Sequence, residues 1–180
     1  MTDYEKVVTW WQEKGITTDA ELAERNTYDI RRWQLGERPG EYKLHDYVTG
    51  KEEIGAPPED VQEEMAELLT ELKEFSDKDA FTAAAYFHAK FENIHPFADG
   101  NGRTGRLAMN YFLVLHNHPP VIIHEEYRRS YYDALEAWDV RQEIRPLLDF
   151  LREQTEKTWK KQVYRKTGYR DGAGGRGIIR

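Results

Sequence analysis

Apolar residues recur at helical spacing along most of the 180-residue chain, so the pattern predicts a mainly helical protein. After Pro57-Pro58, an apolar stripe from Val61 to Phe75 indicates a helix. The segment Ser76-Asp-Lys-Asp79 then breaks it and caps the next one. The remaining helices are predicted over residues 3–14, from 18 or 19 onward, 80–93, 103–116, 127–138 and 143–162.

The segment after Arg38 has a different pattern. Residues 47–51 are typical of a strand that enters a turn at Gly50, which predicts one β-hairpin around Leu44 to Ile54. The predicted fold class is therefore all-α, a helical domain with one β-hairpin. On the pattern alone, an ordinary surface hairpin and a functional one both remain open.

Length and composition predict one intracellular domain with a substantial core. A formal charge of −7 argues against a general nucleic-acid binder, and the absence of cysteine excludes disulfides and thiol chemistry. The acidic N-terminus is not a secretory signal, and no apolar run approaches the roughly 20 residues of a membrane span. We expect a cytoplasmic protein without membrane contact. It would comprise an N-terminal helical segment (1–25), a main domain (26–164) and a basic, glycine-rich, mobile tail (165–180).

The densest chemistry lies in residues 95–106, His-Pro-Phe-Ala-Asp-Gly-Asn-Gly-Arg-Thr-Gly-Arg. The glycines let the backbone turn tightly and come close to a ligand. Apolar residues then recur at helical spacing over 107–114, so the loop leads into a helix N-terminus, a natural phosphate site. Arg103 and Arg106 share one face of the first turn, and both can reach the same polyphosphate.

Transfer of a phosphoryl or nucleotidyl group to a hydroxyl needs a base, charge neutralisation and in-line positioning. His95 is the candidate base, because imidazole can be neutral near pH 7. Asp99 offers the hard carboxylate oxygen that suits Mg²⁺. Arg103 and Arg106 would hold the outer phosphates, and the Asn101 amide an α-phosphate oxygen. Backbone N–H groups are offered by Gly100, Asn101 and Gly102.

Each of these residues has an ordinary explanation when it is taken alone. A histidine is usually structural, Asp99 suits a turn, and the arginines suit a solvated helix face. Their combination in one short loop favours catalysis. Phe97 is expected to point into the core and anchor the loop, and His88 to pack against or orient its neighbours.

The string resembles the Fic family signature, His-x-Phe-x-Asp/Glu-Gly-Asn-Gly-Arg-x-x-Arg, and matches it at every specified position. The flanking sequence from about Arg38 to Arg152 is similar to a Fic domain, so the main domain, 26–164, would be one. The resemblance implies transfer of a nucleoside monophosphate, usually AMP from ATP with release of pyrophosphate, to a hydroxyl side chain (Tyr, Thr or Ser) of a target protein. It assigns the same roles to His95, Asp99 and Phe97.

Two further segments gain a role from the resemblance. The hairpin around Leu44 to Ile54 looks like the family's flap, which holds the backbone of the target protein by strand addition. Tyr131 and Tyr132, with Leu135, resemble the segment near the adenine. For any one of these three side chains, core packing is the better interpretation.

The family's inhibitory motif, Ser/Thr-x-x-x-Glu-Gly/Asn, is absent from the sequence. In the family its glutamate pairs with the second motif arginine, here Arg106. The chain is therefore expected to be de-repressed. Three explanations remain open: a partner supplies the inhibitory helix in trans, regulation differs, or a segment has been deleted near Arg25-Asn26.

Two alternative functions remain. Kinase-like Fic relatives carry Lys where this chain has Gly102, so this glycine favours nucleotide transfer. A non-catalytic phosphate-binding module would not need an intact base and metal carboxylate. The basic tail could still contact an acidic partner, although nucleic acid is an unlikely one.

Overall fold

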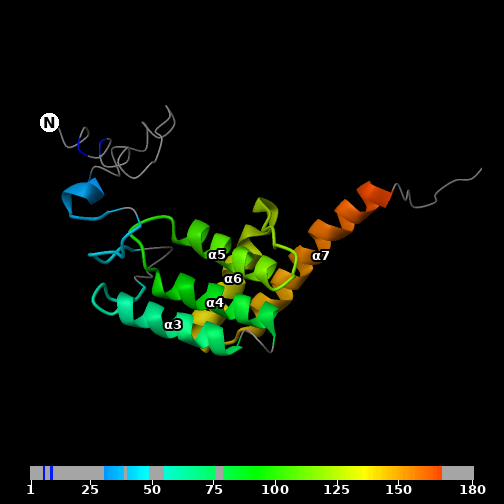
Figure 1. Ribbon diagram of the computed structural model, residues 1–180, viewed down its shortest axis with the longest axis horizontal. Helices are drawn as coiled ribbons and strands as arrows, with labels where there is room; N and C mark the ends of the chain where they lie inside the picture. The colour runs from blue at the N-terminus through cyan, green and yellow to red at the C-terminus, as the bar shows by residue number, and fades with distance from the viewer. Residues whose placement is uncertain are drawn as a thin grey trace, which may run out of the picture. The chain divides into compact units, whose positions relative to one another are not determined.

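The computed structural model describes Lys6, Thr9 and residues 31–38, 40–48, 55–75 and 79–167, with the backbone alone at 75 and 161–167. Figure 1 shows the helices, and no strand occurs in the described part of the chain. Besides the helical residues 31–34, the described helices are α3 (Val61–Phe75), α4 (Ala80–Ile94), α5 (Asn101–Leu115), the short 3₁₀ helix η1 (Glu125–Tyr127), α6 (Arg128–Arg141) and α7 (Arg145–Thr167). The all-α prediction is confirmed.

The chain forms two compact units. The first comprises Met1–Lys78 and Lys90–Ala108, and the second comprises Asp79–Ala89 and Met109–Arg180. The loop 95–100 and the first turns of α5 lie in the first unit, so the predicted catalytic motif belongs to it as a whole.

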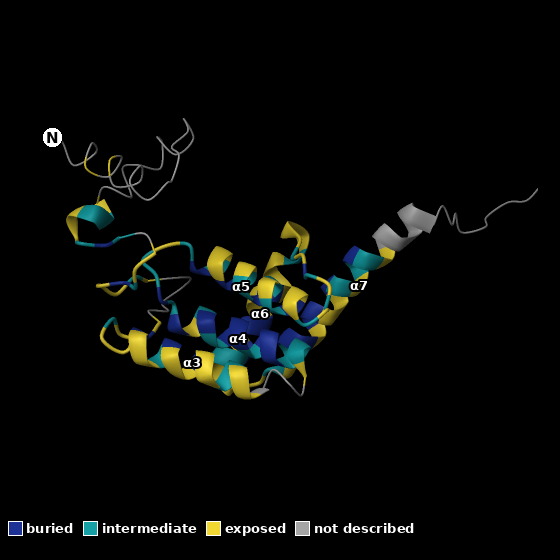
Figure 2. Cartoon of the chain, viewed as in Figure 1, coloured by how far each residue is buried: buried dark blue, intermediate teal, exposed yellow. Residues whose placement is uncertain are grey.

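The core of the second unit is a continuous apolar cluster. The contributing residues of α4 are mostly alanines, which allow close helix packing, and α6 packs along α7. Figure 2 shows the buried face of α4 in dark blue. The cluster comprises Ala84, Ala85, Ala89, Met109, Leu113, Val121, Tyr131, Ala134, Leu135, Leu147, Leu148, Phe150 and Leu151.

Asp79 caps α4, as predicted. Its carboxylate accepts a hydrogen bond from the Thr82 N–H at 3.1 Å and another from the Thr82 hydroxyl at 2.6 Å. These bonds satisfy a donor that the first helical turn leaves unpaired, and they lower the pKa of Asp79.

In the first unit, α3 buries one face through Val61, Met65 and Leu68 at helical spacing. An ion pair of 3.1 Å joins Glu71 of α3 to Lys90, near the end of α4. This part of α4 carries the chain directly into the loop at residue 95.

The predicted β-hairpin is not observed. Residues 44–48 form no strand, and 49–54 lie outside the described residues. Over the described residues, the buried carboxylate of Glu37 organises the backbone instead: its Oε1 accepts from the Leu44 N–H at 2.9 Å and from the Tyr47 hydroxyl at 2.9 Å. His45 Nδ1 lies 3.1 Å from the same oxygen. A side chain thus satisfies the Leu44 N–H that a partner strand would otherwise occupy.

The predicted helix bounds agree with the structure to within a few residues. The largest difference is α7, which runs to Thr167 and so includes the first three residues of the predicted tail. Of the N-terminal segment 1–25, the description covers Lys6 and Thr9 alone, and 168–180 lie outside it. Among the described residues, no helix has the length and apolarity needed to cross a bilayer.

Candidate active site

His95 stands immediately after the last residue of α4, in a left-handed backbone conformation with φ 53°. Its N–H donates to the Phe91 carbonyl at 3.0 Å, which continues the helical hydrogen bonding by one residue. Left-handed residues commonly end helices, but glycine usually takes that position because a Cβ is unfavourable there. The chain therefore accepts backbone strain to place an imidazole at this point.

The hydrogen bond of the His95 ring defines its working nitrogen. Nδ1 lies 3.3 Å from the backbone carbonyl oxygen of Glu92, which accepts and cannot donate. Nδ1 therefore carries the proton in the neutral ring, and Nε2 keeps a lone pair. Burial lowers the pKa of His95; the Glu92 carbonyl opposes this, the charge of Lys43 adds to the lowering, and Asp99 opposes it. The net lowering favours the neutral imidazole, which is the form a general base needs.

The backbone is held on both sides of His95. The Ile94 carbonyl accepts from the Ala56 N–H at 3.0 Å, and the Pro96 carbonyl accepts from the Lys43 N–H at 2.8 Å. Two segments distant in sequence thus fix the carbonyls that flank the histidine.

Asn101 closes the loop. Its Oδ1 accepts from the Phe97 N–H at 2.8 Å, and its Nδ2 donates to the Phe97 carbonyl at 2.7 Å. Asn101 is 2% exposed. The Phe97 ring lies against Tyr42 and Phe91, with centroid distances of 5.9 and 6.2 Å, as its predicted anchoring role requires. The observed role of the Asn101 side chain is to position the loop, and a phosphate contact by its amide stays a prediction.

The N-terminus of α5 has the geometry of an anion site. Gly100, with φ 82°, turns the chain into the helix, and its carbonyl accepts from the Thr104 N–H at 2.9 Å. The N–H groups of Asn101, Gly102 and Arg103 precede this first helical bond, so the helix leaves them unpaired. Such groups favour a bound phosphate.

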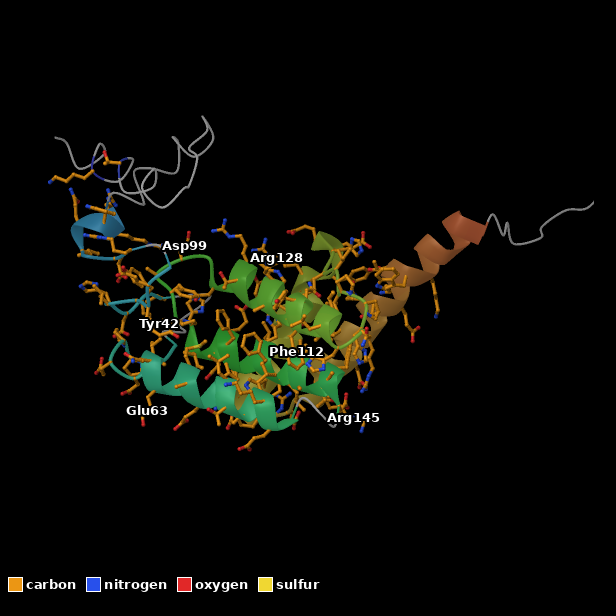
Figure 3. The ribbon with its side chains drawn as sticks, in the orientation of Figure 1. Tyr42, Glu63, Asp99, Phe112, Arg128 and Arg145 are labelled. Carbon is orange, nitrogen blue, oxygen red and sulfur yellow. The ribbon has the colours of Figure 1, made fainter. Side chains whose placement is uncertain are left out.

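Asp99 lies on the loop that enters α5, where Figure 3 labels it. Its Oδ2 is 3.4 Å from Arg103 Nη2 and 3.6 Å from Arg32 Nη1, and its side chain is 58% exposed. Among the described residues, no three histidine or acidic side chains gather into a metal site. One accessible carboxylate is nevertheless the donor set with which Mg²⁺ is typically held beside substrate phosphates.

Arg106 lies one turn after Arg103, beside Gly102. A Cβ built on Gly102 would lie 3.1 Å from Arg106 Nη1 and 3.8 Å from Glu92 Oε2. The glycine therefore leaves the room that the guanidinium occupies along the first turn. Within the described part of the chain, no carboxylate forms an ion pair with Arg106.

The two tyrosines predicted near the adenine differ in their surroundings. Tyr131 is 3% exposed in the core of the second unit, and its hydroxyl lies 2.9 Å from His88 Nε2. Packing, the alternative interpretation, therefore describes Tyr131, and His88 orients it. Tyr132 is 51% exposed, and the Arg128 guanidinium lies over its ring, 5.6 Å from the ring centroid.

Comparison of the sequence with protein-family models shows the family to which the chain belongs. The model of the Fic/DOC family matches residues 21–113, more than half of the chain. The chain belongs to the Fic/DOC family. The motif at 95–106 falls inside the matched range.

Curated relatives are similar to 75 residues of this chain. A protein adenylyltransferase Fic from Aedes aegypti is 48% identical over 75 residues, which cover 42% of this chain and 15% of the relative. A protein of the same name from Drosophila persimilis is 49% identical over 75 residues, with the same coverage. The match thus spans about 15% of the length of these curated relatives.

Solved structures resemble the fold over a longer range. A Fic domain-containing signaling protein from Bacteroides thetaiotaomicron has a TM-score of 0.66 at 24% identity, covering 96% of this chain and 72% of that one. Fic-1 from C. elegans has a TM-score of 0.63 at 28% identity, covering 78% and 43%. A Fic family protein from Desulfovibrio desulfuricans also has a TM-score of 0.63 at 28% identity, covering 79% and 46%. The helical Fic fold therefore extends over most of this chain.

Sequence reasoning missed three residues that contact the site. Arg32 reaches Asp99, Lys43 fixes the carbonyl after His95, and Gly55 lies against His95 itself. They are far from the motif in sequence, so no local spacing joins them to it. Gly55 has a left-handed backbone, with φ 74°, and follows directly after the predicted hairpin, which ends at Ile54.

Proposed function

We propose that this chain is a protein adenylyltransferase that transfers AMP from ATP to a hydroxyl side chain of a target protein. The observation that carries the proposal is the ring geometry of His95, whose Nδ1 faces the Glu92 carbonyl and leaves Nε2 to accept a proton. The matched relatives named protein adenylyltransferase support the assignment of AMP as the transferred group.

In the proposed reaction, a hydroxyl oxygen of the target (Tyr, Thr or Ser) attacks the α-phosphorus of ATP. The bond from that phosphorus to the bridging oxygen of the β-phosphate breaks, and pyrophosphate leaves with the bonding electrons. The hydroxyl proton passes to Nε2 of His95. The products are the AMP-modified side chain and pyrophosphate, so atoms and charge balance.

The remaining motif residues hold the nucleotide. The N-terminal N–H groups of α5 face the α-phosphate, while Arg103 and Arg106 hold the outer phosphates. Asp99 is the residue that would hold Mg²⁺, and its exposed carboxylate fits that ion. When bound, Mg²⁺ neutralises phosphate charge that the arginines leave uncompensated. The contacts of Arg32 and Arg103 keep the Asp99 carboxylate beside the start of α5.

Isotope position tests the reaction. The chain is incubated with a cell lysate, Mg²⁺ and ATP labelled either at the α- or at the γ-phosphate, with the His95→Ala variant as control. Protein-bound label from α-labelled ATP, lost in the variant, is the expected result. Label arriving from γ-labelled ATP alone would assign the chain to the kinase-like relatives. No His95-dependent label from either nucleotide would leave a phosphate-binding module.

We also propose that the target protein binds through residues 44–54 and that a helix supplied in trans inhibits the enzyme through Arg106. Arg106 lies half-buried beside the first turn of α5, where an added carboxylate would compete with the γ-phosphate for its guanidinium. A peptide bearing Ser-x-x-x-Glu-Gly should then suppress transfer, and a Glu→Gln version of that peptide should not. The cytoplasmic location stays a prediction.

A further inference from the structure

The contact between Gly55 and His95 is closer than any side chain permits. A Cβ built on Gly55 would lie 2.6 Å from the His95 Cβ and 2.7 Å from the Ile94 carbonyl oxygen. Neither neighbour is the flexible end of a side chain, so the backbone itself would have to move. The absence of a side chain at Gly55 therefore permits the observed position of the His95 backbone.

The same turn also holds the end of α4. The N–H of Ala56 donates to the Ile94 carbonyl at 3.0 Å, which satisfies one of the carbonyl groups that a helix C-terminus leaves unpaired. Gly55 and His95 both have left-handed backbones, with φ 74° and 53°, and each is the chain neighbour of one partner of this bond. The strained position of His95 is thus maintained by a neighbour that lacks a Cβ.

We propose that Gly55 is a positioning residue for the catalytic His95. This inference rests on the proposed function, because it takes His95 as the base. A side chain at position 55 would shift the His95 backbone and carry Nε2 away from the attacking hydroxyl. The three atoms nearest to a Cβ at Gly55 belong to residues 93–95, which lie outside the proposed nucleotide site at the start of α5, so ATP binding should persist.

A matched control separates contact from conformational strain. Gly40 has a left-handed backbone of φ 81°, and no atom lies within 4 Å of a Cβ built there. Gly40→Ala therefore carries the same conformational cost as Gly55→Ala without the collision at His95. A difference between the two variants reports the contact alone.

The kinetic experiment compares both variants with the parent chain, using α-labelled ATP. Gly55→Ala should lower kcat by roughly 10- to 10²-fold with KM for ATP unchanged, because displacement of a catalytic group by about 1 Å costs this much. Gly40→Ala should stay within about twofold of the parent in both constants. Equal kcat values for the two variants, or a loss in Gly55→Ala that falls on KM, would overturn the proposal.

A double-mutant cycle covers the case in which Gly55→Ala folds poorly. His95→Gly removes the Cβ that the new methyl group meets, so Gly55→Ala should lower the melting temperature less in that background than in the parent. If Gly55→Ala lowered the melting temperature equally in both backgrounds, the proposed contact between positions 55 and 95 would be refuted. A parent chain without AMP transfer, or a fully active His95→Ala variant, would instead refute the proposed function, and the thermal cycle would still decide the contact.

Discussion

The two loops that flank α5 are each held by an asparagine side chain, yet only the first belongs to the family motif at 95–106. Before the helix, the Asn101 side chain bonds both backbone groups of Phe97. After it, Asn110 bonds both backbone groups of Val121, with Oδ1 accepting from the N–H at 2.7 Å and Nδ2 donating to the carbonyl at 3.0 Å. Both asparagines thus act as clamps on an adjacent loop.

What differs is the content of each loop and the helix end that it meets. The first loop brings the candidate base His95 and an exposed carboxylate to the N-terminus of α5, the positive helix end that favours anions. The second loop leaves the C-terminus of the helix, and its histidines 116 and 118 lie against the rings of Phe112 and Phe81. An asparagine clamp therefore indicates a fixed loop, and the helix end decides whether that loop can hold an anion.

The largest expected loss of AMP transfer follows from substitution of His95, the proposed base of the first loop. His95→Ala should reduce AMP transfer by about 10²–10⁴-fold, because it removes the group that accepts the hydroxyl proton. ATP binding, measured by calorimetry, should change little. A variant that retains activity within a few-fold of the parent would show that the first loop lacks the predicted base.

The clamps provide the direct comparison. Asn101→Ala and Asn110→Ala each leave a backbone N–H and carbonyl without their partners, so each should lower the free energy of unfolding by on the order of 2–3 kcal/mol. Asn101→Ala should also lower kcat by about 10-fold or more through loss of loop positioning. Denaturant titration of both variants measures the stability losses, and transfer kinetics measure kcat. Equal kcat losses in the two variants would show that the first loop is no more important for catalysis than the second.

Asp99 tests the metal contribution of the first loop. Asp99→Asn keeps the size of the side chain and removes its charge, so activity at low Mg²⁺ should fall by roughly 10-fold and recover partly at high Mg²⁺. Transfer assays across a Mg²⁺ titration measure the effect. Full activity of Asp99→Asn at low Mg²⁺ would show that Asp99 serves only as a turn residue and does not hold the metal.

The smallest expected effect concerns pH. The pKa of His95 is lowered, chiefly by burial, from its ordinary value of 6.5, so the acid limb of the kcat profile should lie below that pH. Lys43→Met removes one of the contributions that lower this pKa, so the limb should move toward higher pH, whereas Lys43→Arg should leave it in place. An unchanged profile in Lys43→Met would exclude that charge as a cause.

The same shift has a stability consequence with a definite sign. Because the folded pKa lies below the unfolded one, the native state binds fewer protons between the two values. The contribution of His95 to folding is therefore fully present above about pH 6.5 and is lost as the pH falls through the folded pKa.

Local patterns predicted the helices well because their signals are local. The apolar spacing that starts at Val61 and the cap at Asp79 both act within one or two turns. The motif at 95–106 could also be recognised from the sequence, since the residues proposed to hold the phosphates and accept the proton all lie within twelve positions. The predicted hairpin is not seen over its described residues, 44–48, and no local pattern could show that Glu37 would satisfy the Leu44 N–H.

The sequence by itself determined that a helix follows the motif, but the tertiary structure decided which face of it is buried. The apolar residues Leu107, Tyr111 and Val114 that predicted α5 are 73%, 66% and 55% exposed, whereas Met109 and Leu113 enter the core. Likewise, the sequence determined that a histidine stands before an anion site. Only the tertiary structure decided its conformation and proton affinity, because burial, the charge of Lys43 and the missing Cβ of Gly55 come from residues that folding brings to it.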